Sequence, residues 1–108
     1  MNINAQNLDY YQLNQAIRRA EGPVVIDHCL GQRFIGTALG AGRSLTIHGV
    51  PGNAMGAYLD GGSIEVFGDV QEATGDTMNA GTIVVHGSAG DATGYSMRGG
   101  VILIERDV

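Results

Sequence analysis

The sequence predicts an all-β fold: a right-handed parallel β-helix in which each coil of about 19 residues supplies one strand. Three observations lead to this prediction. The chain repeats itself every 19 residues, apolar residues recur at matched positions, and glycine makes up 18 of the 108 residues while proline makes up two. Because the usual glycine share is only ~7 %, this excess indicates a repeated geometric role rather than a flexible linker.

The repeat is clearest in the second half of the chain. Residues 52–70 read GNAMGAYLDGGSIEVFGDV, residues 71–89 read QEATGDTMNAGTIVVHGSA, and residues 90–108 read GDATGYSMRGGVILIERDV; adjacent copies share six identical positions. A weaker copy spans residues 31–50 with one extra residue near Arg43, and GPVVID at residues 22–27 is similar to the strand of a partial copy. An antiparallel sandwich would explain the turn spacing but not the matching residue types, so stacked coils are favoured.

Stacking the repeats places residues of one type above one another. Two apolar columns alternate with variable positions, as expected of a short strand with one buried face. These columns are Leu45, Ile64, Ile83, Ile102 and Ile47, Val66, Val85, Ile104. A second inward set is predicted elsewhere in the coil: Ala54, Ala73, Ala92 with Leu59, Met78, Met97. Because one repeat cannot bury such a face alone, each coil must pack on its neighbours.

Glycine recurs at fixed phases of the repeat. One set lies between the two parts of the second inward set, and two further sets mark corners of the coil. The sets are Gly56, Gly75, Gly94; then Gly61, Gly62, Gly99, Gly100; then Gly49, Gly68, Gly87. A sharp corner often needs a positive φ, which glycine adopts without a Cβ penalty, so the corner glycines are predicted to have positive φ.

The N-terminal segment has a different pattern, which predicts an amphipathic helix over residues 8–21 with Asn7 as its N-cap. Its apolar residues, Leu13, Ala16, Ile17 and Ala20, recur at helical spacing. Arg18, Arg19 and Gly22 suit its C-terminal end. Because an open coil exposes core and backbone groups, this helix or the segment 2–5 is expected to cap the solenoid. We therefore expect one domain, 1–108, with about four and a half coils over residues 22–108.

Composition narrows the range of partners and locations. The formal net charge is −5 and the pI is about 4.8, which argues against nucleic acid and anionic membrane surfaces as partners. The single cysteine, Cys29, excludes an intramolecular disulfide and a multi-cysteine metal site. No signal peptide is visible, and no apolar run approaches the roughly 20 residues that a membrane-spanning helix needs. The expected location is the cytoplasm.

Few residue patterns indicate chemistry, and no catalytic, cofactor-binding or metal-binding residue is predicted. His48 and His86 share an outward column but lie about 9.6 Å apart with Phe67 between them, which favours surface histidines over a metal site. The column Asn53, Glu72, Asp91 is interpreted as a solvated polar ridge. Cys29 follows His28 directly, and adjacent strand residues point to opposite faces, so Cys29 is interpreted as a small buried hydrophobe rather than a nucleophile.

The repeated motif resembles the GXGXG family. The pattern G-x-x-G-x-x-(M/L)-x-x-G-x-I-x-V-x-G is carried by residues 52–68, 71–87 and 90–105, with Gln71 in place of the first glycine of the middle copy and Arg106 in place of the last corner glycine. The family contains the C-terminal β-helix domain of the glutamate synthase large subunit, its stand-alone archaeal and bacterial counterparts, and a β-helical component of formylmethanofuran dehydrogenase. The stretches GQRFIG, LNQAIR and GDATGYSMRGG are similar to the stand-alone glutamate-synthase form.

The resemblance implies a scaffold rather than a catalyst. In that family the β-helix holds a glutamine amidotransferase domain against a flavin-containing synthase domain, and no family catalytic residue maps onto this chain. We therefore expect a non-catalytic assembly module that binds a second copy or glutamate-synthase-like subunits. The expected interface is the last coil: Met97, Ile102, Leu103, Ile104, Glu105 and Val108. The alternative is a stand-alone small-molecule or metal-binding protein that uses the face of His48, Phe67 and His86.

Overall fold

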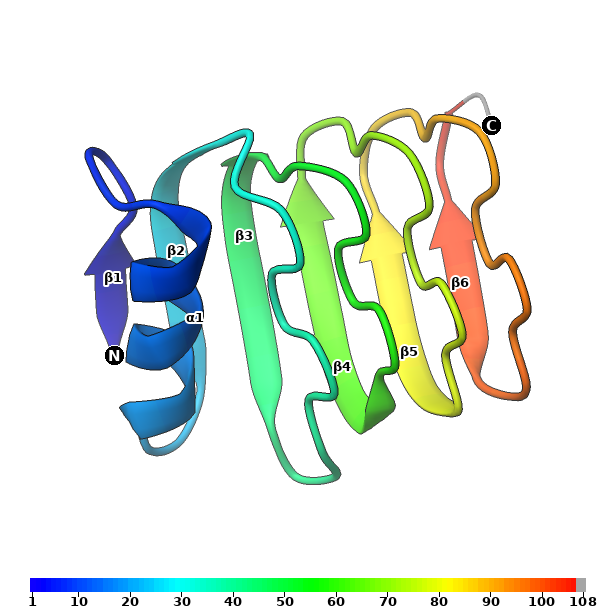
Figure 1. The fold of residues 1–108 in the computed structure, drawn as a ribbon, viewed down its shortest axis with the longest axis horizontal. Helices are drawn as coiled ribbons and strands as arrows, with labels where there is room; N and C mark the ends of the chain where they lie inside the picture. The colour runs from blue at the N-terminus through cyan, green and yellow to red at the C-terminus, as the bar shows by residue number, and fades with distance from the viewer. Residues whose placement is uncertain (107–108) are drawn as a thin grey trace.

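A computed structural model describes residues 1–106 and contains one sheet of six parallel strands in the order β1-β2-β3-β4-β5-β6. Successive strands are neighbours, as in a solenoid, and Figure 1 shows them side by side along its long axis. The elements are β1 (Asn2–Asn4), α1 (Tyr10–Arg19), β2 (Val24–Leu30), β3 (Ser44–Val50), β4 (Asp60–Phe67), β5 (Ala80–Val85) and β6 (Val101–Ile104). The predicted parallel β-helix with an N-terminal helix is confirmed.

The strand register confirms the repeat length. Leu45 pairs with Ile64, Ile64 with Ile83, and Ile83 with Ile102, so each step along the sheet is 19 residues. The inward columns are buried through the middle coils: Ile47, Val66, Ile83 and Val85 are each 0 % exposed. Their counterparts in β6, Ile102 and Ile104, are only partly buried, because no further described coil covers them. Stacking thus builds one aliphatic core that weakens at its C-terminal end.

The wall opposite the sheet consists of turns rather than strands. In one coil the amide of Ala57 donates to the carbonyl of Ala54 and the amide of Leu59 to that of Gly56, which makes two successive turns. Coils are joined here too, because the Gly56 amide donates to the Ile35 carbonyl of the preceding coil. In Figure 1 these turns form the winding trace beside the strands. We call this surface the turn wall: residues 33–39, 53–59, 72–78 and 91–97.

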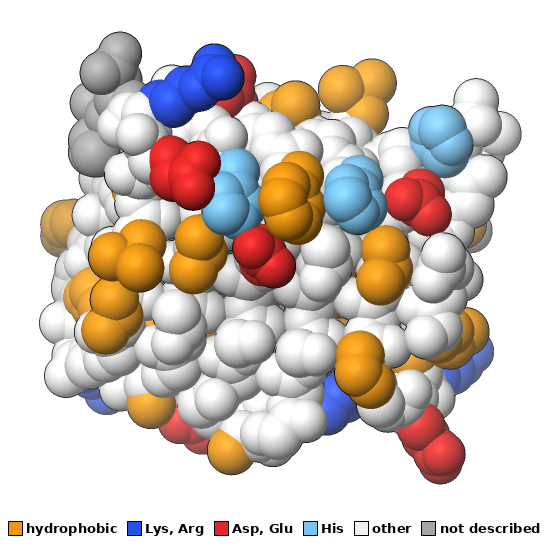
Figure 2. All heavy atoms as spheres, turned by 180° about the vertical axis from the view of Figure 1, so that it is seen from behind, with side chains coloured by type: hydrophobic (Ala, Val, Ile, Leu, Met, Phe, Trp, Pro, Cys, Tyr) orange, Lys and Arg blue, Asp and Glu red, His pale blue; other side chains and the backbone are white. Residues whose placement is uncertain are grey.

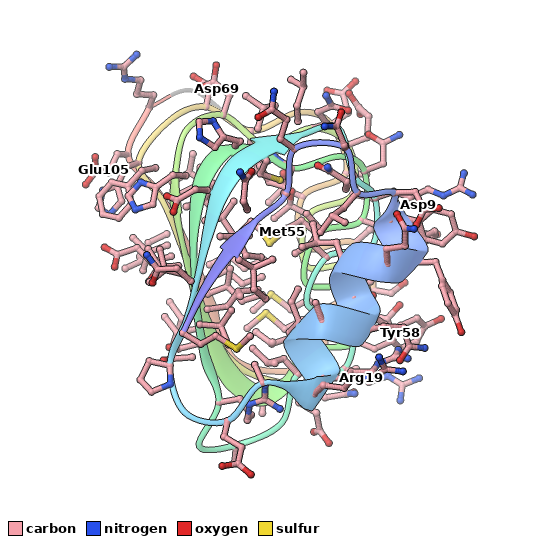
Figure 3. All side chains as sticks on the ribbon, turned by 90° about the vertical axis from the view of Figure 1, so that its left-hand side faces the viewer. Asp9, Arg19, Met55, Tyr58, Asp69 and Glu105 are labelled. Carbon is pink, nitrogen blue, oxygen red and sulfur yellow. The ribbon has the colours of Figure 1, made fainter. Side chains whose placement is uncertain are left out.

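The turn wall corrects one part of the predicted core. Leu59 and Met78 are fully buried as expected, and Met97 is partly buried. The alanine column does not form a continuous buried row: Ala54 is 7 % exposed, but Ala73 is half-buried and Ala92 exposed. The buried column lies one residue later, at Ile35, Met55 and Thr74, each 0 % exposed, and Figure 3 shows Met55 inside the solenoid. The alanines instead hold left-handed positions, with φ of 58° to 59°.

The glycines serve two different purposes, which corrects the prediction that every corner glycine has positive φ. Positive φ is found at Gly49, Gly61 and Gly100, and at the column Gly56, Gly75, Gly94. It is not found at Gly62, Gly68, Gly87 or Gly99. Those positions need glycine because neighbouring coils approach too closely: a Cβ on Gly68 would lie 2.0 Å from the carbonyl oxygen of Gly49.

The helix α1 replaces the turn wall in the first coil. Leu13 and Ile17, at 0 % and 2 % exposure, point its apolar face at the core, as predicted. It is shorter than the predicted range 8–21, and its N-cap is Asp9, not Asn7. Asp9 accepts from the Gln12 amide while the Gln12 side chain accepts from the Asp9 amide, a capping box. Among the described residues, no helix has the length and apolarity needed to cross a membrane.

The extra residue of the weaker repeat has a structural role. Ser44 still pairs with Ser63, and Gly40 bridges Asp60, so the additional residue is accommodated between Gly40 and Ser44. Arg43 lies in this loop, and its Nη2 donates to the carbonyls of Ile17 at 2.7 Å and Ala20 at 3.2 Å. Those carbonyls belong to the C-terminal end of α1, where a cation is favourable. The insertion therefore fastens the helix to the first complete coil.

The close approach at Gly68 predicts a large cost for one methyl group. Gly68→Ala should reduce the free energy of unfolding by about 3 kcal/mol or more, since backbone rather than a flexible side chain stands in the way. Urea unfolding measures this change. Gly40→Ala is the matched control, because nothing lies within 4 Å of the added Cβ and its φ is not positive. It should change stability by less than about 1 kcal/mol, and equal effects would contradict the stacking argument.

The contact between Arg43 and α1 predicts a second stability change. Arg43→Ala should cost about 1.5–3 kcal/mol, because it removes two hydrogen bonds from a charged donor to helix-terminal carbonyls. Hydrogen exchange should show the loss concentrated in α1. The exposed Arg98 provides the control, and Arg98→Ala should stay within about 0.5 kcal/mol of the unchanged chain. Undiminished protection of α1 in Arg43→Ala would show that the helix does not depend on this contact.

Candidate functional site

A row of stacked rings lies on the outer face of the sheet. Because coils are in register, His48, Phe67 and His86 stand directly beside one another, with ring centroids 5.2 Å apart for the first pair and 4.5 Å for the second. The planes are nearly parallel, at 12° and 15°. Figure 2 shows this row, with the hydrophobic ring between the two histidines. The predicted outward column is therefore confirmed as a continuous stack.

His86 connects three coils through its two ring nitrogens. Its Nε2 lies 2.7 Å from Oε2 of Glu65, and its Nδ1 lies 2.7 Å from Oε1 of Glu105. Both partners are carboxylates, and both ring nitrogens can donate only when the imidazole is protonated. The hydrogen bond to Glu65 and then that to Glu105 raise the pKa of His86 above its ordinary 6.5, against a smaller opposing effect of burial. The sequence columns contained both carboxylates, but this diagonal bridge was not anticipated.

The ring row is not arranged as a metal site. Phe67 separates the two histidines, and the carboxylates of Glu65 and Glu105 occupy both ring nitrogens of His86. Within residues 1–106, no group of three or more His, Cys, Asp or Glu side chains could hold a metal ion. The metal-binding form of the alternative hypothesis therefore has no support in the described part of the chain.

Two other predicted features have structural roles. The ridge of Asn53, Glu72 and Asp91 is a hydrogen-bonded ladder: the Glu72 amide donates to Asn53 Oδ1 at 3.1 Å, and the Asp91 amide to Glu72 Oε2 at 3.0 Å. Each side chain thus binds the backbone of the next coil. Cys29 is 3 % exposed, as predicted, and burial raises the pKa of its thiol to about 12. Such a thiol is protonated at neutral pH and is a poor nucleophile.

The predicted interface residues lie together on the last coil. The outward side chains of β6 are exposed, with Val101 at 50 % and Leu103 at 55 %, while Ile102 and Ile104 are only partly covered. No strand within residues 1–106 pairs with the free edge of β6. We define the fifth-coil surface as Met97, Val101, Ile102, Leu103, Ile104 and Glu105. Val108, also predicted for the interface, lies outside the described residues, and binding at this surface stays a prediction.

The two ends of the solenoid differ. At the N-terminal end, Ile3 is 7 % exposed and Leu13 is 0 % exposed, so β1 and α1 close the core. Both predicted capping segments therefore contribute. At the opposite end the core columns reach the surface in β6, and Figure 2 shows hydrophobic side chains grouped at that end of the sheet face. An apolar surface next to an unpaired strand edge is typical of an interaction site.

A stack of parallel coils with one closed end defines this chain as a β-solenoid repeat protein. The family comparison is more specific: the model of the GXGXG motif family matches residues 5–108. The chain belongs to that family. No match was found among curated proteins or among solved structures.

The bridge from His86 to Glu65 and Glu105 predicts a pH-dependent stability. Because folding raises the pKa of His86, its contribution is fully present below the unfolded value of about 6.5 and is lost as pH rises through the folded pKa. Thermal unfolding across pH 5.5–8.5 or so should therefore show a decline over that window. NMR titration of the His86 ring should give a pKa above 6.5.

The control for this prediction keeps the stack and removes the proton. His86→Phe retains an aromatic ring beside Phe67 but cannot titrate, so the stability decline above pH ~6.5 should become shallower. Glu65→Gln should lower the pKa of the His86 ring, because it removes the first of the two carboxylate partners. A His86 pKa at or below 6.5 in the unchanged chain would contradict the bridge.

Proposed function

We propose that this protein is a non-catalytic structural module that acts as a subunit or scaffold in a glutamate-synthase-like or related amidotransferase complex. Membership of the GXGXG family supports this proposal, together with the similarity of its motifs to the stand-alone glutamate-synthase β-helix. The absence, within residues 1–106, of a group of side chains suited to metal-assisted chemistry is consistent with it but does not carry it.

The observation that carries the proposal is the fifth-coil surface. Its inward residues belong to columns that are fully buried in the preceding coils, and burying them again would recover about 25 cal/mol per Å² of apolar area. Its outward residues Val101 and Leu103 are half exposed, and the free edge of β6 offers backbone groups to a further strand. A second copy or a partner subunit that continues the sheet would satisfy both needs by strand addition.

The test is whether assembly depends on this surface. The purified chain should form a complex, either with itself or with amidotransferase and flavin-containing synthase subunits from the same organism, when measured by size-exclusion chromatography with light scattering. Leu103→Glu should weaken that complex at least about tenfold, since it places a charge in an apolar contact. A monomer that binds none of these subunits would overturn the proposal.

A matched control separates the surface from general effects of added charge. Tyr95→Glu introduces the same charge at an exposed position of the same coil, because Tyr95 is 65 % exposed on the turn wall, away from β6. It should leave the complex unchanged. If Tyr95→Glu and Leu103→Glu weaken assembly equally, the contact does not lie on the sheet side of the fifth coil.

A further inference from the structure

A second surface lies at the other end of the molecule, in a groove between α1 and the turn wall. Its volume is about 290 Å³. The helix contributes a stripe of side chains along one side, and two coils of the turn wall contribute the other. Tyr10, Tyr11, Arg18, Phe34, Thr37 and Tyr58 are among the residues that line it. Figure 3 shows Tyr58 beside the helix, and Figure 1 places α1 and β6 at opposite ends of the solenoid.

The groove gathers aromatic side chains that the core does not use. The chain has four tyrosines, two phenylalanines and no tryptophan, and all six are exposed. Four of these six line this one groove, at exposures of 41 % for Tyr10, 60 % for Tyr11, 43 % for Phe34 and 53 % for Tyr58. Single exposed apolar residues are ordinary, but a contiguous group of large rings marks a binding surface. Packing of the protein itself does not account for this grouping.

The rings and polar groups of the groove are already held in place. Tyr10 and Phe34 pack edge to face, with centroids 6.5 Å apart. Asn14 is fixed at both ends, because its Nδ2 donates to the Tyr10 carbonyl at 2.9 Å and its Oδ1 accepts from the Gly36 amide at 3.1 Å. The Thr37 hydroxyl donates to the Phe34 carbonyl. A preformed surface binds without the entropic cost of ordering its side chains.

The charge of the groove is opposite to that of the protein. Arg18 lines it, and the Arg33 guanidinium lies 4.4 Å from the centre of the Tyr10 ring. No acidic side chain lines the groove, and neither arginine forms an ion pair within the described residues. The net charge of the chain is −5. A ligand with acidic groups would therefore be attracted to this site by its local charge and not by the molecule as a whole.

The shape of the groove decides between a small molecule and a chain segment. Small-molecule sites usually enclose 70–90 % or so of the ligand surface, whereas these rings stay about half exposed along an open surface. Proline-rich segments bind such aromatic grooves, because their rings pack flat on aromatic faces and their extended helix needs no partner for its backbone. We propose that this groove binds an extended, proline-rich segment of a partner protein that carries acidic residues beside its prolines. This goes beyond the proposed assembly through the fifth coil.

The test uses synthetic peptides and the unmodified full chain. Titration of the ¹⁵N-labelled protein with the peptide EEPPPPPPEE should shift the amides of Gln15, Phe34 and Thr37. Tyr58→Ala and Arg18→Glu should each weaken binding about tenfold. Tyr58→Ala is expected to fold, because alanine already occupies left-handed turn-wall positions such as Ala38. An unchanged amide spectrum outside the groove checks this.

Two peptides and two variants provide the controls. The lysine peptide KKPPPPPPKK should bind at least about tenfold more weakly, and so should the flexible acidic peptide EEGSGSGSEE. Tyr95→Ala, an exposed turn-wall ring outside the groove, should bind EEPPPPPPEE normally. Leu103→Glu should also bind it normally, so failure of the fifth-coil assembly would leave this result intact. Equal binding of all three peptides, no binding of EEPPPPPPEE, or groove shifts with adenosine monophosphate instead would each overturn the proposal.

Discussion

Backbone hydrogen bonds between coils hold neighbouring windings in register at the spacing of adjacent strands, about 4.8 Å. Every other feature depends on that fixed spacing. On the sheet side it places Ile64 beside Leu45 and Ile83, so the core is built from columns of similar side chains. At the corners it leaves no room for a Cβ, as at Gly68. On the outer face it forces His48, Phe67 and His86 into a stack.

The same constraint explains why the two ends of the solenoid differ in function. An interior coil is covered on both sides, whereas a terminal coil is covered on one. The N-terminal coil resolves this by exchanging its turns for α1, whose Leu13 and Ile17 complete the core and whose C-terminal carbonyls are bound by Arg43. In the described chain β6 has no equivalent cover. The outer side of α1, freed from core packing on that face, carries the tyrosines and arginine of the groove.

The sequence predicted what the 19-residue period records and missed what it does not. Strand columns and register follow from the period, because each coil repeats the same burial. The turn wall was assigned one residue out of phase, since left-handed residues such as Ala73 break simple alternation and the buried neighbour is a threonine, Thr74. Asn7 and Asp9 are both cap-type residues, and only the capping box with Gln12 separates them. The groove joins a helix to two coils, a packing relation that no repeat encodes.

Hydrogen exchange of the isolated chain, residue by residue, tests most directly whether stability comes from stacked coils with one uncovered end. The account predicts a gradient along the solenoid: strand amides in β3 and β4 exchange slowest, and protection falls toward β6, where a neighbour is missing on one side. Assembly through the last coil should then slow exchange in β6 more than in β3. Uniform protection from β2 to β6 in a monomeric chain would contradict it, because it would mean that the last coil needs nothing beside it.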